Sequence, residues 1–189
     1  NTSGLRISQI AGKMQYPERA VTTHFWLPAY LVPLVEVVPG EKTEMETARQ
    51  AIAELKQWGK SPVLVRKDCP GQLANRILQA IIREAANIVE MGLATAEDVD
   101  TAIKMGMALR FPVWGPLEHV DAVGLEICTQ VQDTVLPGLS ASDKAPDIMR
   151  RMLESGDTGC QAGRGFYDWE QKNLQDLEKK RDSFIANAL

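Results

Sequence analysis

The sequence predicts an α/β layer of partial Rossmann type that is followed by an all-α helical domain. Strand, helix and strand signals alternate over the first third of the chain, which is the rhythm of an α/β layer. After the turn-forming run Lys67–Gly71, apolar residues recur almost throughout at helical spacing. We therefore expect two domains, over residues 1–67 and 68–189. With 189 residues, of which 44% are hydrophobic, the chain is long enough for one domain or two small ones.

The first part of the chain is predicted to contain three strands and two helices. Ser3 is placed to cap a short helix over Ile7–Met14, which ends before Pro17. Runs rich in β-branched residues mark the strands, and Pro39-Gly40 ends the second of them. The expected strands are Ala20–His24, Val32–Val38 and Pro62–Val65, and the second helix begins at Thr43 and ends at Gly59.

The second part is predicted to be helical throughout. Apolar residues cover most of the circumference of the helix at 77–89, so we expect this helix to be buried on several sides. The later helices are expected from the capping box at Thr95–Asp98 to Ile103, from Pro116 to about Val135, from Pro146 to Gly156 and from Glu170 to Ala188, with a glycine-rich turn at Gly163–Tyr167.

Composition and charge exclude several classes of function. Lys and Arg number 21 and Asp and Glu 25, a net charge of −4, and we find no basic patch, so neither nucleic acid nor a membrane surface is an expected partner. The most apolar stretch, Phe25–Val38, is interrupted by prolines and a glutamate and is too short to span a bilayer. The three cysteines are odd in number and widely spaced, which favours a reducing compartment, and we expect a cytoplasmic protein.

His24 and Glu36 are the residues whose positions first suggest chemistry. His24 lies at the expected end of a strand, and Glu36 interrupts an apolar strand on the face that it shares with Leu34 and Val38. A buried carboxylate without a partner is costly, so Glu36 is expected to be protonated or paired. If the two strands are neighbours, Glu36 would orient the imidazole of His24 as a general base. The alternative is a capped histidine beside a glutamate on an exposed edge strand.

Several blocks of the sequence resemble the 3-hydroxyacyl-CoA dehydrogenase family, whose relatives include gulonate and carnitine dehydrogenases and λ-crystallin. They match in order from residue 1 to about residue 169, and it is the number of ordered blocks that makes the resemblance specific. The blocks are Asn1–Ser3, Thr23–Pro28, Pro33–Val38, Pro70–Arg76, the Gly115-Pro116 pair with Asp121 and Gly124, and Gly163–Tyr167.

The resemblance implies a role for five residues. His24 matches the catalytic base and Glu36 the carboxylate that orients it. Asn75 matches an asparagine that holds the substrate, Ser3 a serine near the reacting carbon and the nicotinamide, and Asn1 a residue beside the cofactor. Without the resemblance, Ser3 is interpreted as a helix N-cap and Asn75 as a polar residue in the first turn of a helix.

The resemblance also implies a function. It is NAD-dependent oxidation of the 3-hydroxy group of a 3-hydroxyacyl-CoA to the 3-oxo form, and the reverse, by a homodimer. One alternative is a dehydrogenase of a free 3-hydroxy acid or another alcohol without CoA. An alternative of another class is a dimerisation or structural module without catalysis. No metal is expected, because His119, the other histidine, has no His or Cys partner at ligand spacing.

The sequence departs from the family pattern at three positions and lacks one motif. Leu27 stands where an asparagine contacts the cofactor in relatives, Gln161 where a lysine is frequent, and Gln72 where an aromatic residue is common. The dinucleotide fingerprint GxGxxG does not occur in these 189 residues, and the single Gly-x-Gly is Gly163–Gly165. We expect that these 189 residues come after the fingerprint half of a Rossmann domain. We also expect this chain by itself to be inactive and to bind NAD weakly.

Overall fold

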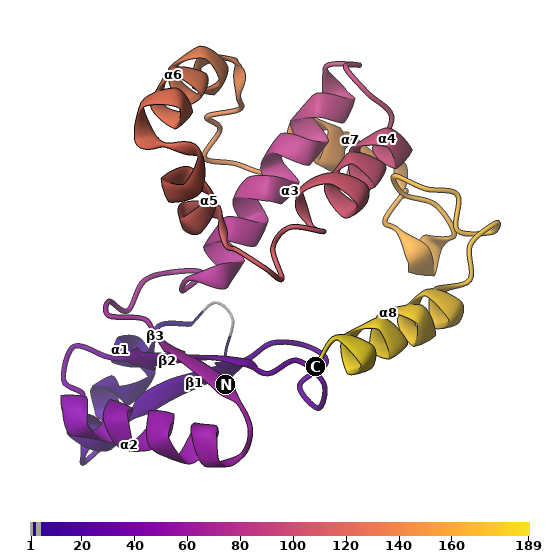
Figure 1. The fold of residues 1–189 in the computed structure, drawn as a ribbon. Coiled ribbons are helices and arrows are strands. Elements are labelled where there is room, and N and C mark those ends of the chain that lie inside the picture. The colour runs from indigo at the N-terminus through magenta and orange to yellow at the C-terminus, as the bar shows by residue number, and fades with distance from the viewer. Residues whose placement is uncertain (1, 3–4) are drawn as a thin grey trace. The chain divides into compact units, whose positions relative to one another are not determined.

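The computed structural model describes residue 2 and residues 5–189 of the chain, which divides into two compact units. One unit consists of residues 1–79 together with 175–189, and the other of residues 80–174. A three-stranded sheet lies in the first unit, and helices make up the second (Figure 1). The predicted fold class, an α/β layer followed by a helical region, is confirmed.

The sheet is mixed, with strand order β1-β2-β3. Strands β1 and β2 are antiparallel, and β2 and β3 are parallel. A parallel pair needs a crossover between its strands, and helix α2 supplies it here. The bounds are Val21–Phe25 for β1, Leu34–Pro39 for β2, Met45–Gln57 for α2 and Ser61–Leu64 for β3. Each strand lies within two residues of its prediction at either end.

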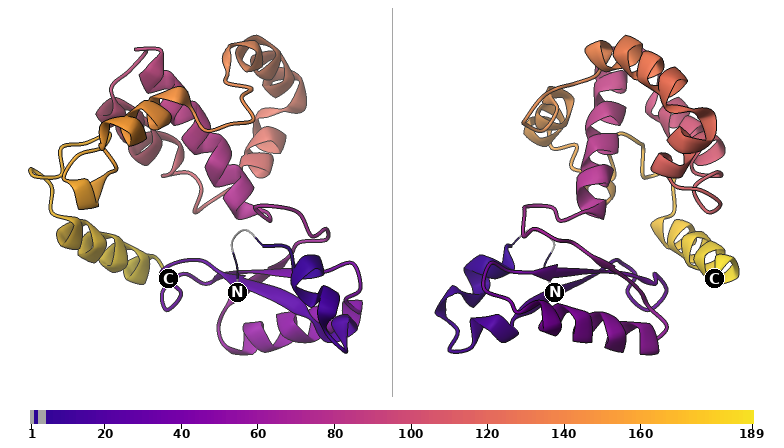
Figure 2. Two further views of the ribbon diagram at one scale, coloured as in Figure 1. Left: turned by 180° about the vertical axis from the view of Figure 1, so that it is seen from behind. Right: turned by 60° about the vertical axis from the view of Figure 1, so that its left-hand side comes forward.

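Helix α2 covers one face of the sheet (Figure 2). Its Ala48 and Leu55 form a buried core cluster with Val35 and Val37 of strand β2. Strand β2 is the central strand, and its residues from Val35 to Pro39 are all buried. Glu36 lies among them, so the interpretation of its strand as an exposed edge is wrong.

A short helix precedes the sheet. Helix α1 spans Ile7–Ile10 and continues as a 3-10 turn over Ala11–Lys13. Its N-cap residue is Arg6, whose side chain makes no capping hydrogen bond. Ser3, which the sequence suggested as the cap, and Asn1 lie outside the described residues.

The helical part keeps the predicted order with two corrections. The helix expected from Pro116 to Val135 is two helices, because Gly124 has a φ of 107°, a value that favours glycine and does not belong to a helix. The last helix begins four residues later than Glu170. The bounds are α3 Ala74–Glu90, α4 Ala96–Ala102, α5 Pro116–Val123, α6 Leu125–Val135, α7 Asp147–Ser155 and α8 Leu174–Ala188, with a π-helical turn over Ile103–Met107.

Helix α3 is less buried than its sequence predicts. Of its residues only Ala86 is buried, and Ile77 is 53% exposed. The apolar surface of α3 is wider than the surface that the described residues place against it. Other local signals hold: Thr95 caps α4 by accepting a hydrogen bond from the N–H of Asp98, and Gly156 ends α7 in the left-handed conformation.

Candidate active site at the end of strand β1

His24 and Glu36 are direct partners in the antiparallel ladder of strands β1 and β2. His24 Nδ1 lies 2.7 Å from Glu36 Oε2. The residues are 7% and 0% exposed, so the pair lies almost entirely out of solvent. The ladder register explains the contact, since side chains directly opposite each other point to the same face of a sheet.

Glu36 accepts four hydrogen bonds, two on each oxygen. Oε2 accepts from the His24 ring and, at 3.0 Å, from the indole Nε1 of Trp26. Oε1 accepts from the backbone N–H groups of Leu73 and Ala74, each at 2.8 Å. A carboxylate accepts about four hydrogen bonds and donates none, so this environment fits the ionised form. Glu36 is therefore a buried charge with a complete set of donors.

The pKa of Glu36 follows from these contacts. Burial is the largest single influence and raises the pKa of the carboxyl. The hydrogen bonds from the His24 ring, the Ala74 N–H, the Trp26 indole and the Leu73 N–H act in the opposite direction, and the resulting pKa lies below the ordinary value of 4.5. Glu36 is thus a carboxylate at neutral pH, despite its burial.

This carboxylate determines which ring nitrogen of a neutral His24 carries the proton. Because Glu36 only accepts, Nδ1 must donate, and the lone pair of the ring lies on Nε2. If Nε2 takes up a proton, the imidazolium lies beside a negative charge at 2.7 Å. The pair therefore has the arrangement of a general base with its orienting carboxylate.

Asn75 is the neighbour in the chain of a residue that bonds to Glu36. It is the second residue of helix α3 and follows Ala74, whose N–H binds Glu36. Its Oδ1 accepts a hydrogen bond from Gln79 Nε2 at 3.2 Å. Leu27, which lies two residues beyond the end of β1, is exposed. Asn75 thus directly follows a residue that is bonded to Glu36, whereas Asn1 and Ser3 lie outside the described residues.

Sequence reasoning missed three of the four donors to Glu36. The backbone groups of Leu73 and Ala74 carry no sequence signal of their own. Trp26 did carry a sequence signal, because its indole N–H, two residues after His24, is a donor that needs a partner when it is partly buried.

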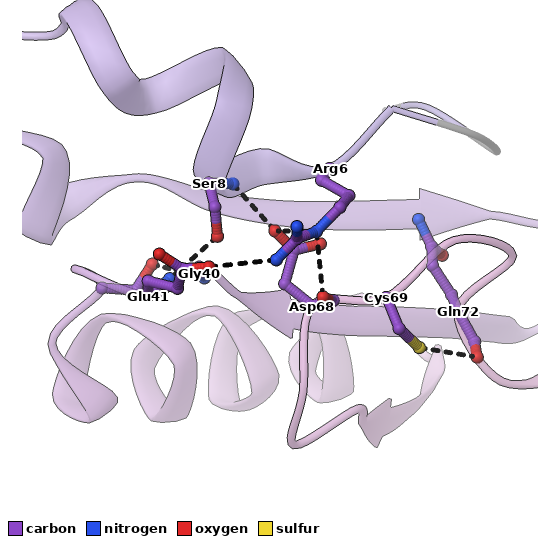
Figure 3. Close-up of polar contacts among 8 residues, drawn as sticks. Arg6, Ser8, Gly40, Glu41, Asp68, Cys69 and Gln72 are labelled. Carbon is purple, nitrogen blue, oxygen red and sulfur yellow. Dashed lines mark hydrogen bonds and ion pairs between the residues drawn. The ribbon is translucent and has the colours of Figure 1, made fainter.

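A second polar cluster holds the N-terminal segment against the chain that leads to helix α3 (Figure 3). Asp68 accepts a hydrogen bond from the Ser8 N–H at 2.8 Å and forms an ion pair with Arg6 at 3.6 Å. Arg6 also contacts Glu41 at 3.1 Å. Nearby, Gln72 adopts a φ of 52° and its Nε2 donates to the carbonyl of Thr2 at 2.8 Å. These contacts join Thr2, Arg6 and Ser8 to the segment that leads into helix α3.

The Gly-x-Gly turn at Gly163–Gly165 does not have the place in the fold of a dinucleotide fingerprint, which joins a strand to a helix. Gly163 and Gly165 belong to a turn in the helical unit, and a Cβ on Gly165 would lie 2.9 Å from the Cα of Gly159. The backbone at Gly165 is therefore packed against its own turn and leaves no room there for a phosphate. Residue 2 and residues 5–189 also contain no group of three or more His, Cys, Asp or Glu side chains able to hold a metal ion.

Comparison with known families assigns both parts of the chain. Residues 1–69 match the NAD-binding domain of 3-hydroxyacyl-CoA dehydrogenase, and residues 71–169 match the C-terminal domain of the same enzymes. The chain belongs to the 3-hydroxyacyl-CoA dehydrogenase family. The resemblance noted from the sequence blocks is confirmed.

Individual members of the family differ in their substrates. The chain is 38% identical over 173 residues to a probable 3-hydroxybutyryl-CoA dehydrogenase of Bacillus subtilis. This alignment covers 91% of the chain and 59% of that protein. It is 32% identical over 181 residues to 5-formyl-3-hydroxy-2-methylpyridine 4-carboxylate 5-dehydrogenase of Mesorhizobium japonicum. This alignment covers 96% of the chain and 59% of that protein. The chain thus spans about three fifths of the length of these relatives.

A solved structure agrees with this family membership. It is that of a 5-formyl-3-hydroxy-2-methylpyridine 4-carboxylic acid 5-dehydrogenase, described as an NAD+-dependent dismutase. It matches with a TM-score of 0.92 and 32% identity, over 97% of the chain and 60% of the solved protein. No helix within the described part of this 3-hydroxyacyl-CoA dehydrogenase family member is long and apolar enough to cross a membrane.

Proposed function

We propose that the full-length protein containing this chain oxidises the 3-hydroxy group of a 3-hydroxyacyl-CoA to the 3-oxo form, and catalyses the reverse reaction, with NAD as cofactor. The observation that carries this proposal is the buried pair of His24 and Glu36, at 2.7 Å, in a member of this family. Oxidation of an alcohol requires a group that takes the hydroxyl proton, and the pair is built for that task.

In the proposed reaction, Nε2 of His24 takes the proton from the 3-hydroxyl group. Glu36 stabilises the imidazolium that results, through its bond to Nδ1. We propose that Asn75 and Ser3 hold the substrate oxygens and that Asn1 and Ser3 lie beside the cofactor, as the family resemblance implies. NAD is proposed because residues 1–69 match an NAD-binding domain.

The division of labour between the two parts is also a proposal. We assign residues 1–67 to the cofactor domain and residues 68–189 to substrate binding and dimerisation. Analytical ultracentrifugation of the full-length protein tests the second assignment. A dimer is expected, and a monomer at micromolar concentration would contradict it.

A second candidate function is oxidation of a free hydroxy acid or another alcohol without CoA. It is favoured by the similarity to a dehydrogenase whose name specifies a pyridine carboxylate rather than a CoA thioester. The same pair of His24 and Glu36 would serve either substrate, because proton removal does not depend on what the carboxyl end of the molecule is joined to.

One assay separates the two candidates. NADH consumption by the full-length protein is followed with acetoacetyl-CoA and, separately, with acetoacetate. Turnover with the thioester alone supports the first function, and turnover with the free acid alone supports the second. No turnover with either substrate, from a folded protein that binds NADH, would count against the first function and would point to another alcohol without CoA as the substrate.

A further inference from the structure

The indole of Trp26 contacts both members of the His24–Glu36 pair. Trp26 is the first residue after strand β1 and is half-buried. Its Nε1 donates to Glu36 Oε2 at 3.0 Å, and its ring meets the His24 ring edge-on, at 6.2 Å between centroids and 61° between planes. The oxygen that accepts from the indole is the same oxygen that accepts from His24. Trp26 therefore acts on the one atom through which the carboxylate reaches the base.

We infer that Trp26 is a positioning residue that lowers the basicity of His24 by sharing Oε2 of Glu36. The inference rests on the proposed function of His24 as the base. An oxygen that accepts two hydrogen bonds spreads its charge over two donors, so each donor is held less strongly than a single one would be. With the indole N–H in place, Oε2 stabilises the imidazolium less than it would alone.

The position of the carboxylate adds a second effect. The backbone of Leu73 and Ala74 fixes Oε1, and the indole with the histidine fixes Oε2, so the carboxylate plane is held at both ends. Loss of the indole N–H leaves Oε2 with one donor. The carboxylate that sets the direction of the His24 ring is then held by one hydrogen bond fewer, which is expected to lower turnover more than substrate affinity.

The variant Trp26→Phe tests this role, because phenylalanine keeps an aromatic ring and removes the N–H. In the full-length protein we expect the acid limb of the pH profile of kcat/KM to move up by about half a unit to one unit, the equivalent of one hydrogen bond. We expect kcat to fall by about two- to tenfold, with little change in KM. Trp58→Phe is the matched control, since Trp58 is 66% exposed at the end of helix α2 and should leave the profile unchanged.

Nuclear magnetic resonance of the 189-residue chain provides a readout that is independent of turnover. The chain has two histidines, so the ring nitrogens of His24 are resolved against those of His119. In Trp26→Phe the His24 ring is expected to gain its second proton at a higher pH than in the unsubstituted chain, by the same half unit to one unit. An unchanged midpoint in a folded variant would overturn the role of Trp26, whether or not the protein proves to be a dehydrogenase.

The unsubstituted chain supplies a further test in case the variant does not fold. The indole N–H resonance of Trp26 is expected to shift with pH together with the ring nitrogens of His24, because both bind Oε2. The indole resonance of Trp58 is expected to stay constant over that range. A Trp26 resonance that ignores the titration of His24 would overturn the proposal.

Discussion

Glu36 Oε1 accepts a hydrogen bond from the backbone N–H of Ala74, the first residue of helix α3, at 2.8 Å. The first N–H groups of a helix have no partner within the helix and must be satisfied from outside. Here a side chain from the central strand satisfies two of them, at Leu73 and Ala74. Glu36 therefore serves the proposed base through one oxygen and caps a helix through the other, so its replacement should affect stability as well as chemistry.

Glu36→Gln is expected to destabilise the chain by roughly 3 kcal/mol, although the two side chains have the same shape. An amide offers one acceptor oxygen, and its NH2 group would face N–H donors in either orientation. Urea denaturation measures the change. Glu46→Gln is the matched control, because that carboxylate is exposed in an ion pair with Arg49, and a loss of less than about 1 kcal/mol is expected there. Equal losses in the two variants would contradict the capping role.

Stability should fall in acid because of Glu36. Its pKa in the folded chain is lowered, so its contribution is fully present above the unfolded-state pKa near 4.5 and is lost as pH falls through the lower folded-state pKa. The urea midpoint, compared between about pH 6 and about pH 3, should therefore fall more in the unsubstituted chain than in Glu36→Gln. A constant difference between the two chains over this range would contradict the lowered pKa.

His24→Ala is expected to lower the turnover of the full-length protein by roughly 10²- to 10⁴-fold, the usual effect of a positioned acid–base group. Steady-state NADH consumption measures it. His119→Ala, in the helical unit, is the control and should stay within about twofold of the unsubstituted protein. A loss of less than about tenfold in His24→Ala would remove the residue from the role of base.

Asp68 and Glu41 allow a comparison of two carboxylates that bind the same arginine. The Asp68 side chain is 5% exposed and also accepts the Ser8 N–H, whereas the Glu41 side chain is 74% exposed. Asp68→Ala should cost about 2 kcal/mol because it leaves a partly buried N–H unpaired, and Glu41→Ala less than about 1 kcal/mol. Thermal unfolding of both variants checks the order, and the reverse order would show that the exposed pair matters more.

NAD should bind weakly to these 189 residues, because the GxGxxG turn that cradles a diphosphate does not occur in their sequence. Isothermal titration of the chain with NAD measures the affinity, and the full-length protein is the reference. A submicromolar Kd for the chain would contradict the prediction and would point to a phosphate site elsewhere.

The strand and helix order was predictable because it depends on local patterns. Runs of β-branched residues, Pro39-Gly40 and the Thr95 cap each act within a few residues, and each marks the element that the structure shows. The break at Gly124 was also encoded locally, but glycine within an apolar helical pattern gives no sign that its φ is positive. The exposure of Ile77 was not predictable, since burial depends on what packs against a helix.

The candidate site was predictable to the extent that its residues were anomalous. Glu36 stood out because a charged residue interrupted a buried strand, and His24 because it ended the neighbouring one. The register that joins them and the backbone donors at Leu73 and Ala74 depend on tertiary structure, so no pattern within the sequence marks them. The roles assigned to Asn75, Ser3 and Asn1 rest on the family resemblance and stay predictions.

The four donors to Glu36 come from stretches of chain that are far apart, the nearest ten residues before it and the farthest thirty-eight after it. In an unfolded or half-assembled chain this carboxylate would be an ordinary solvated acid, and His24 an ordinary solvated imidazole. A competent base therefore exists only after strand pairing and the start of helix α3 are both in place. A partly folded molecule is therefore inactive, because the oriented base forms only together with the complete fold of this unit.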